Sequence, residues 1–536
     1  MSNEAIKKII KKNPKNKKEL MECKRRAARE DGVEINKNSE ILKVYKQLLS
    51  RGVIARNIGL EKILRKRSIR TLSGVAPVAV LTKNYPCPGE CVYCPDEKNV
   101  PKSYLSNEPA VMRAIRNKYD PYRQVQLRLK ALENNGHFPT KIELIVIGGT
   151  WSVLPEKYKY WYIKECFRAA CDYPLDKDKR DLDCKNYSKK TKKVLLEELR
   201  KQQKKNEGAE YKIIGVTLET RPDFINEKEL WQMRVLGATR VELGVQAVDN
   251  RVLSLNRRGH DLEATIKATQ MLRDYGFKIT YHIMPGLPGS SYRKDLDMFK
   301  KLFEEASFKP DQIKFYPTVV TKGSLLYRWW KQGRYKPYSD KRLQELIVEC
   351  KKFIPYYTRV IRLIRDIPGE SIEAGNKITN LRQVMKDKGV FCSCIRCREV
   401  RDGAVDPLSL ELFVFEYEAG QGKELFLSYE SFDRSSLYGF LRLRLPFDKK
   451  NNIFGCKKTA LIRELHVYGE LVGVGEKSRK RPQHRGLGRK LIVEAEKIAS
   501  KNKYENMAII SGVGVRPYYR KLGYRLKNTY MIKKLS

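Results

Sequence analysis

Six short segments rich in β-branched and aromatic residues alternate with helical stretches between residues 76 and 320, and this pattern constrains the fold most strongly. The segments are VAPVAVLT, KIELIVIGGT, YKIIGVTLET, TRVELGVQA, FKITYHIMPG and QIKFYPTVV. Strands that alternate with helices form parallel βα units. Because six units do not close an eight-stranded barrel, we predict an α/β fold with an open, partial (β/α)6 barrel of the TIM type over residues 76–370.

Polar and glycine residues follow these predicted strands, at the edge where barrel enzymes build their sites. Gly148 and Gly149 allow the backbone to approach a ligand closely, because glycine has no side chain. Glu219, Arg221 and Gln246 place polar groups at the predicted mouth, suited to hold a ribose or a carboxylate. Each residue taken singly would be an ordinary strand-end residue, so the prediction depends on their shared position.

Three cysteines follow the first predicted strand in the string CPGECVYC, with the spacing C-x3-C-x2-C. A cubane [4Fe–4S] cluster normally takes four thiolates, so the ligand set Cys87, Cys91 and Cys94 leaves one iron free. A free iron can chelate the amino and carboxylate groups of S-adenosylmethionine. The loop thus resembles that of the radical SAM superfamily, and Gly148-Gly149 resembles its GG motif. The alternative is a structural zinc site with a distant fourth ligand.

In residues 406–536 the sequence again has the pattern of strands, here around one amphipathic helix. This pattern predicts a compact terminal domain. The string QHRGLG at residues 483–488 precedes that helix, whose apolar residues fall near one face. Glycines before a helix expose backbone N–H groups to a pyrophosphate, and the helix dipole adds to the attraction. The surrounding pattern resembles the GCN5-related acetyltransferase fold. Tyr518 and Tyr519 are candidates for a hydroxyl near the CoA sulfur, the alternative being two core tyrosines.

A second cysteine cluster, FCSCIRCREV, places Cys392, Cys394 and Cys397 in a linker over residues 371–405. Closely spaced thiolates outside the first cluster predict a structural zinc ion. The fourth ligand stays open among Cys350, Cys456 and a histidine. The alternative is three reduced cysteines in a tight loop.

The chain is strongly basic, with 109 Lys and Arg against 63 Asp and Glu. Such a charge, with 30 tyrosines, favours an RNA partner over a surface that serves solubility alone. Residues 1–75 predict a basic helical arm that binds tRNA. No run of apolar residues is long enough to span a membrane and no secretory signal is present, so we expect the cytoplasm.

Long strings in the two halves resemble one family, the Elongator catalytic subunits. They are SYLSNEPAVMRAIRNKYDPY, RELHVYG and SGVGVRPYYRKLGY. The resemblance implies a radical SAM module fused to an acetyltransferase module that acts as an acyltransferase on tRNA. The implied reaction installs a carboxymethyl group on carbon 5 of the wobble uridine, using S-adenosylmethionine and acetyl-CoA. This chain has SYLS at residues 103–106 where the family often has SYTG.

The resemblance also implies roles for single residues. Cys87, Cys91 and Cys94 match the cluster ligands, Lys164 matches a lysine associated with acetyl-CoA, and Lys314 matches a lysine at the barrel mouth that contacts substrate or thioester. The remaining acetyl-CoA residues would line the pantetheine arm and the pyrophosphate: Glu464, Leu465, His466, Val467, Gln483, His484, Arg485, Gly486 and Gly488. Expected partners are the tRNA anticodon stem-loop and an electron donor, and the expected state is a monomer or homodimer.

Two other functions compete with tRNA modification. One is a protein lysine acetyltransferase that keeps the iron–sulfur module for structure. Since a net charge of +46 repels a lysine-rich substrate, RNA is favoured. The other is a scaffold that only binds tRNA, which would need neither the three cysteines nor the QHRGLG string.

Overall fold

The computed structural model describes residues 3–32, 35, 37–65, 74–174, 186–378, 380–400, 410–450, 453–468 and 486–535. Seven parallel strands form the central sheet in the order β1-β2-β3-β4-β5-β6-β8. Their bounds are Ala76–Leu81, Lys141–Ile147, Lys212–Thr220, Ala238–Gln246, Lys278–Ile283, Gln312–Phe315 and Arg359–Arg362. The six predicted strands are confirmed, and β8 is a seventh. Because β1 and β8 lie at opposite edges of the sheet, the barrel is open.

Helices cover the outer face of this sheet and bury its strands. All of β4 except Gln246 is buried, as expected for a parallel strand that is covered on both faces. The barrel helices are α5 (Pro109–Arg116), α6 (Pro121–Asn134), α7 (Glu156–Asp172), α8 (Lys192–Gly208), α9 (Glu227–Val235), α10 (Asn250–Leu255), α11 (Leu262–Asp274), α12 (Tyr292–Glu304), α13 (Leu325–Lys331) and α14 (Asp340–Lys352). A small antiparallel ribbon pairs β7 (Val320–Thr321) with β9 (Ile372–Ala374), and the helices α15 (Leu381–Asp387) and α16 (Ile395–Arg398) follow.

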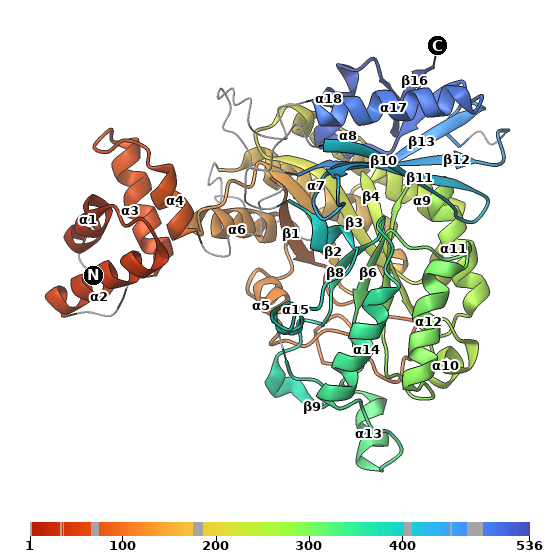
Figure 1. The fold of residues 1–536 in the computed structure, drawn as a ribbon, viewed down its shortest axis with the longest axis horizontal. Helices are drawn as coiled ribbons and strands as arrows, with labels where there is room; N and C mark the ends of the chain where they lie inside the picture. The colour runs from red at the N-terminus through yellow and green to blue at the C-terminus, as the bar shows by residue number, and fades with distance from the viewer. Residues whose placement is uncertain are drawn as a thin grey trace.

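The N-terminal arm is a small helical unit with its own apolar core. It contains α1 (Asn3–Lys12), α2 (Lys17–Asp31), α3 (Asn38–Ser50) and α4 (Ile58–Leu64), and it lies to the left of the barrel in Figure 1. Ile9, Ile41 and Leu64 are fully or almost fully buried within it. The arm is anchored to the barrel at α6, where Lys46 Nζ donates a 3.0 Å hydrogen bond to Glu133 O.

The C-terminal domain is a second sheet in the order β10-β11-β12-β13-β14-β16-β15. The strands are β10 (Leu410–Glu418), β11 (Gly422–Ser431), β12 (Leu437–Pro446), β13 (Thr459–Val467), β14 (Asn506–Ile509), β15 (Arg525–Lys527) and β16 (Tyr530–Lys534), with α17 (Leu487–Lys501) and α18 (Arg516–Arg520). Helix α17 buries Leu491, Ile492 and Ala495 against this sheet, as its apolar spacing predicts. The two-module α/β architecture is therefore confirmed, whereas the boundaries expected at residues 75, 370 and 405 remain predictions.

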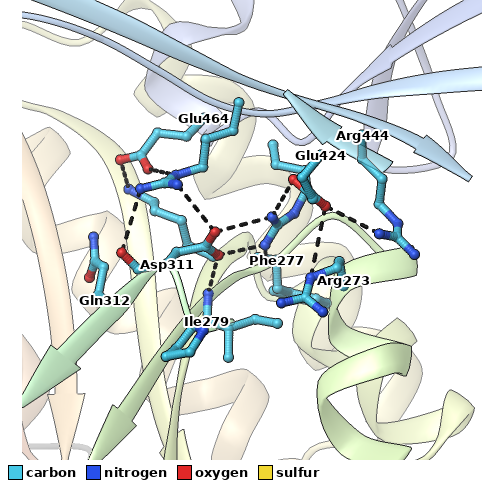
Figure 2. A network of polar contacts seen from close by, with 12 residues as sticks. Arg273, Phe277, Ile279, Asp311, Gln312, Glu424, Arg444 and Glu464 are labelled. Atoms are coloured by element: carbon cyan, nitrogen blue, oxygen red, sulfur yellow. Dashed lines mark hydrogen bonds and ion pairs between the residues drawn. The ribbon is translucent and has the colours of Figure 1, made fainter. Parts of the chain in front are cut away.

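A buried network of ion pairs joins the two modules (Figure 2). Asp311, which directly precedes β6, receives hydrogen bonds of 3.1 and 2.5 Å from both terminal nitrogens of Arg463 on β13. Arg463 Nη1 also lies 2.9 Å from Glu424 Oε2 on β11. Since Asp311 and the neighbouring Lys278 lie at the amino ends of barrel strands, the C-terminal sheet covers that end of the barrel.

Hydrogen bonds and charge together keep Asp311 ionised. Burial alone would raise the pKa of its carboxyl group, but Arg463 and Arg442 outweigh burial and hold the pKa below its usual value. The backbone N–H of Ile279 donates a further bond of 2.9 Å to the same carboxylate. Buried ions are costly to leave without a partner, so each member of this network depends on the others.

No helix in the described part of the chain is long and apolar enough to cross a membrane.

The variant Asp311→Asn is expected to destabilise the protein by about 3 kcal/mol, because it leaves Arg463 and Arg442 buried with less compensating charge. Urea unfolding followed by tryptophan fluorescence measures this loss. The matched control is Asp366→Asn, since the Asp366 side chain is 64% exposed and its removal should cost little. Equal stability of the two variants would contradict the role given to the network.

The same network predicts an acid limit to stability. A carboxyl group with a lowered pKa in the folded state stabilises the fold above its unfolded pKa of about 3.9, and this contribution is lost as the pH falls through the folded value. The wild-type advantage over Asp311→Asn should therefore persist from neutral pH to about pH 4 and shrink only below it. An advantage that disappears between pH 7 and pH 5 would contradict this assignment.

Candidate active site

The loop after β1 carries the three cysteines of the first motif. A Cβ atom added to Gly89 would lie 3.5 Å from Cys91 Sγ and 3.6 Å from Cys87 Sγ, so the loop wraps closely around this glycine. Arg258 Nη1 donates a 3.0 Å hydrogen bond to Cys91 Sγ and supplies positive charge beside the thiol. Burial, followed by repulsion from Cys91, raises the pKa of Cys94 to about 12. A metal centre bound here would favour loss of this proton, because a cysteine binds metal as the thiolate.

The glycine pair after β2 lies directly beside this loop. Gly148 has φ +133° and Gly149 has φ +89°, and a Cβ atom at Gly148 would overlap Thr82. Only glycine fits the first position without displacing that neighbour. The adjacent Thr150 hydroxyl lies 3.8 Å from Cys87 Sγ, which places the end of β2 next to the cysteines.

The other predicted polar residues line the same mouth. Arg221 forms two hydrogen bonds of 2.9 Å to Asp223, and its guanidinium group lies next to Gly89. Glu219 Oε2 accepts a 3.2 Å hydrogen bond from Tyr104. Gln246 has the left-handed φ of +71°, and its buried Oε1 has no hydrogen-bond partner among the described residues. Strain and an unsatisfied polar atom at one residue are typical of a site that a ligand completes.

Lys314 lies inside the barrel in a charged group that the sequence did not reveal. Its ammonium group contacts the carboxylate of Glu242, and His282 Nε2 lies 2.8 Å from the same oxygen, Glu242 Oε2. Burial favours neutral Glu242, but Lys314 and His282 outweigh burial and hold the pKa of Glu242 well below its usual value. The barrel axis therefore carries a fixed pair of opposite charges.

At the other end of the barrel, β13 presents the predicted acetyl-CoA strand. The parallel ladder between β13 and β14 ends at the pair Ile462 and Ile509, so the backbone of residues 464–467 continues beyond it. Glu464 Oε1 lies 2.8 Å from Lys278 Nζ, which ties this strand to the barrel. Burial lowers the pKa of His466 to about 4, so the ring is neutral, and within the described part of the chain its Nε2 has no hydrogen-bond partner.

The start of α17 faces this strand. Gly486 caps the helix with φ +71°. A Cβ atom at Gly488 would lie 3.0 Å from the Tyr518 hydroxyl and 3.7 Å from Leu465, so the structure brings these three predicted residues together. Tyr519, in contrast, is 7% exposed and packs in the domain core. Gln483, His484 and Arg485 lie outside the described residues.

Lys164 lies neither with the residues at the cysteine loop nor with the residues predicted to bind acetyl-CoA. It lies on α7, where its Nζ is 2.8 Å from Glu165 Oε1 and 3.1 Å from Glu198 Oε2. It is absent from the residues that line the cavity described below. Its expected role at acetyl-CoA stays a prediction.

The second cysteine cluster forms a compact group at α16. Cys392 Sγ and Cys397 Sγ lie 3.6 Å apart. Within the described ranges, Cys392, Cys394 and Cys397 are the one set of His, Cys, Asp or Glu side chains whose ligand atoms all lie within 4.8 Å, as a single ion requires. Cys350 and Cys456, the cysteines considered as a fourth ligand, do not belong to this set. These three thiols supply three of the four ligands that a structural zinc ion usually has, so a fourth ligand would have to complete the site.

One cavity of about 1250 Å³ connects the two ends of the barrel. It begins beside Tyr93 in the cysteine loop and Gln246 at the mouth, passes Glu242 and Lys314, and reaches Glu464 and His466 on β13. A closed eight-stranded barrel, in contrast, has an interior packed with side chains. Because a single small-molecule site occupies about 300–1000 Å³, this cavity has room for more than one ligand.

Several residues of this site were missed in the sequence. Arg258 lies next to the cysteine loop, and burial together with Arg258 lowers the pKa of His260 to about 3. Both belong to the string RRGHD, which is typical of an exposed turn. Glu242 carried a weak signal, because an acidic residue within a buried strand needs a partner.

The variant Glu242→Gln is expected to destabilise the protein by about 3–5 kcal/mol, because Lys314 is then left buried without its counter-charge. The double variant Glu242→Gln/Lys314→Met removes the unpaired charge and should recover part of that loss. Thermal and urea unfolding of Glu242→Gln, Lys314→Met, the double variant and the wild type complete the double-mutant cycle. A double variant that loses the sum of the two single losses would contradict the pairing.

Comparison with known proteins agrees with this geometry. Residues 85–302 match the model of the radical SAM superfamily, and residues 310–388 match the radical SAM C-terminal domain. The tRNA uridine(34) acetyltransferase of Dehalococcoides mccartyi is 43% identical over 484 residues, which cover 88% of this chain and 100% of that protein. Human Elongator complex protein 3 is 39% identical over 493 residues, covering 88% of this chain and 86% of that protein.

A solved structure shows the same arrangement. The Methanocaldococcus infernus Elp3 with an N-terminal deletion aligns with a TM-score of 0.71 at 40% identity, and the alignment covers 87% of this chain and 100% of that one. The chain therefore belongs to the radical SAM family that contains the tRNA uridine(34) acetyltransferases and Elongator complex protein 3.

Proposed function

We propose that this chain is a tRNA-modifying acyltransferase that installs a carboxymethyl group on carbon 5 of the anticodon wobble uridine. It would use S-adenosylmethionine radical chemistry and acetyl-CoA. The cavity that joins the cysteine loop to β13 carries this proposal, because the reaction needs the acetyl methyl group and the radical source in one enclosed space. The names of the relatives support the tRNA substrate.

The residues at the mouth suit the first two cofactors. Cys87, Cys91 and Cys94 would hold a [4Fe–4S] cluster, which supplies an electron for the reductive cleavage of S-adenosylmethionine. Gly148 and Gly149 would approach its methionine moiety by backbone alone. Glu219, Arg221 and Gln246 would hold its ribose or carboxylate, with the unsatisfied Oε1 of Gln246 finding a partner there.

The C-terminal module suits acetyl-CoA. The backbone from Glu464 to Val467 extends beyond the β14 ladder and would pair with the pantetheine arm. Gly486, Gly488 and the start of α17 would receive the pyrophosphate, together with Gln483, His484 and Arg485. The position of Tyr518 beside Gly488 favours Tyr518 over the buried Tyr519 as the hydroxyl near the thioester.

The interior residues would orient the reacting groups. Lys314 keeps its positive charge because Glu242 outweighs the effect of burial and raises the pKa of the ammonium group. A fixed cation at this place can contact the substrate or the carbonyl oxygen of the thioester, where negative charge develops. Glu242 and His282 would hold Lys314 in position.

The remaining features supply binding and structure. The basic arm would hold tRNA phosphates while the anticodon stem-loop reaches the cavity. Cys392, Cys394 and Cys397 would hold a structural zinc ion between the modules. We propose a cytoplasmic enzyme that works as a monomer or homodimer with a separate electron donor.

A protein lysine acetyltransferase is the alternative, and the position of β13 disfavours it. The predicted acetyl-CoA strand, β13, lines the cavity inside the barrel. An extended peptide substrate would have to pass buried charges to reach it. The overall charge of +46 also repels lysine-rich segments.

The test is an anaerobic assay with the cluster reconstituted in the full-length protein. Dithionite, S-adenosylmethionine, acetyl-CoA and unmodified tRNA are added, and the tRNA nucleosides are weighed after digestion. We expect uridine to gain one carboxymethyl group. Cys91→Ala should abolish the gain because it removes a cluster ligand, whereas Cys171→Ala, on the outer helix α7, should retain it.

Unmodified uridine in the wild-type reaction, with acetyl-CoA still hydrolysed, would contradict the proposal. It would mean that the acetyltransferase module works without the radical module.

A further inference from the structure

A basic and aromatic segment covers the outer side of the cysteine loop. Residues 322–338 contain five Lys and Arg and no Asp or Glu. We call the exposed side chains of these five the α13 patch: Lys322, Arg328, Lys331, Arg334 and Lys336. Figure 1 shows that α13 protrudes at the bottom of the view, at the end of the molecule opposite α17.

The charges of the α13 patch are largely without counter-charge. Lys322 Nζ lies 3.5 Å from Glu373 Oε1, whereas the other four form no ion pair with any residue that the structure describes. Aromatic rings fix two of the cations: Lys331 Nζ lies 5.1 Å from the ring centre of Trp330, and Arg334 Cζ lies 5.1 Å from that of Trp329. Exposed cations held in place without anions attract an acidic surface.

The patch is connected to the cysteine loop through the backbone. Leu326 N donates a 2.8 Å hydrogen bond to Val92 O, and Asp96 N donates a 3.3 Å bond to Gly323 O. Val92 lies between Cys91 and Cys94 in the sequence. The segment that carries the α13 patch is therefore bonded directly to the cysteine loop and its continuation, through the backbone of Leu326 and Gly323. Since electron tunnelling falls steeply with distance, such a surface suits the approach of an electron donor.

The geometry favours a protein partner over RNA for this patch. None of its five residues lines the cavity, so a base that binds here would not reach the interior. Stacking of RNA bases needs free aromatic faces, whereas Trp329 and Trp330 already carry cations over their rings and pack partly against the core.

We propose that the α13 patch is the docking surface for an acidic electron-transfer protein. This inference rests on the proposed function, which requires a one-electron reductant. The donor's low-potential iron–sulfur or flavin centre loses one electron, and the cluster held by Cys87, Cys91 and Cys94 gains it. No bond is formed or broken and no proton moves in this step.

The experiment compares two charge reversals in the full-length protein with its cluster. The test variant is Arg328→Glu/Lys331→Glu/Lys336→Glu. The matched control, Lys497→Glu/Lys501→Glu/Lys503→Glu, makes the same change in net charge on exposed residues in and just after α17. The probe is a small acidic ferredoxin, whose association rate constant is measured by biolayer interferometry at low and high salt. Cleavage of S-adenosylmethionine is measured in parallel with reduced ferredoxin and with dithionite.

We expect the patch reversal to lower the ferredoxin association rate constant by about tenfold or more at low salt relative to the control, because the steering charges are inverted. The difference should shrink at high salt, where charges are screened. Cleavage driven by ferredoxin should fall, whereas cleavage driven by dithionite, which needs no docking surface, should equal that of the wild type. If the reversal impairs folding, Arg328→Gln/Lys331→Gln/Lys336→Gln should show the same pattern with a smaller decrease.

Equal ferredoxin association for the patch reversal and the control would overturn the proposal. A loss of tRNA affinity with unchanged ferredoxin association would also overturn it and would make the patch an RNA surface. Failure of the wild type to cleave S-adenosylmethionine with dithionite would contradict the proposed function instead, which the association rates do not test.

Discussion

The pairing of Asp311 with Arg463 is the interaction on which the arrangement of this molecule depends. It joins a residue that precedes β6 to a residue of β13 across 152 positions of sequence, and both side chains are fully buried. Arg442, Glu424 and Arg444 extend the pairing over the face where the modules meet (Figure 2). Buried charges make a poor source of net stability, but they penalise any arrangement that leaves one of them unpaired. The network therefore specifies how the C-terminal sheet sits on the barrel.

That orientation gives the cavity its two ends. Because the C-terminal sheet covers the amino ends of the barrel strands, β13 closes one end of the cavity and the cysteine loop lies at the other. The interior between them keeps Glu242, His282 and Lys314 in place of the usual apolar layers. Such a polar interior costs stability, and functional sites commonly carry such a cost. Under the proposed function, two co-substrates would enter from opposite ends and meet inside the barrel.

Local sequence patterns predicted the elements of this site better than the contacts between them. The alternating strands, the cysteine loop after β1 and the glycines at Gly148 and Gly488 could be predicted, because each depends on a few consecutive residues. Strand β8 was missed because its short string TRVIRLIR is rich in arginine. The pairs Asp311–Arg463 and Glu242–Lys314 could not be predicted, since nothing local shows which charges are buried together. Lys164, chosen by resemblance, lies against Glu165 and Glu198 instead of the cavity.

In the proposed reaction, the cavity brings the methyl group of acetyl-CoA to the radical generated at the cysteine loop. The direct measurement uses acetyl-CoA with a deuterated methyl group, S-adenosylmethionine, dithionite and unmodified tRNA, followed by mass spectrometry of the 5′-deoxyadenosine formed. We expect the 5′-deoxyadenosine to carry one deuterium atom taken from the acetyl group. Unlabelled 5′-deoxyadenosine, formed at the same rate with and without acetyl-CoA, would contradict it and would separate the two modules into independent enzymes.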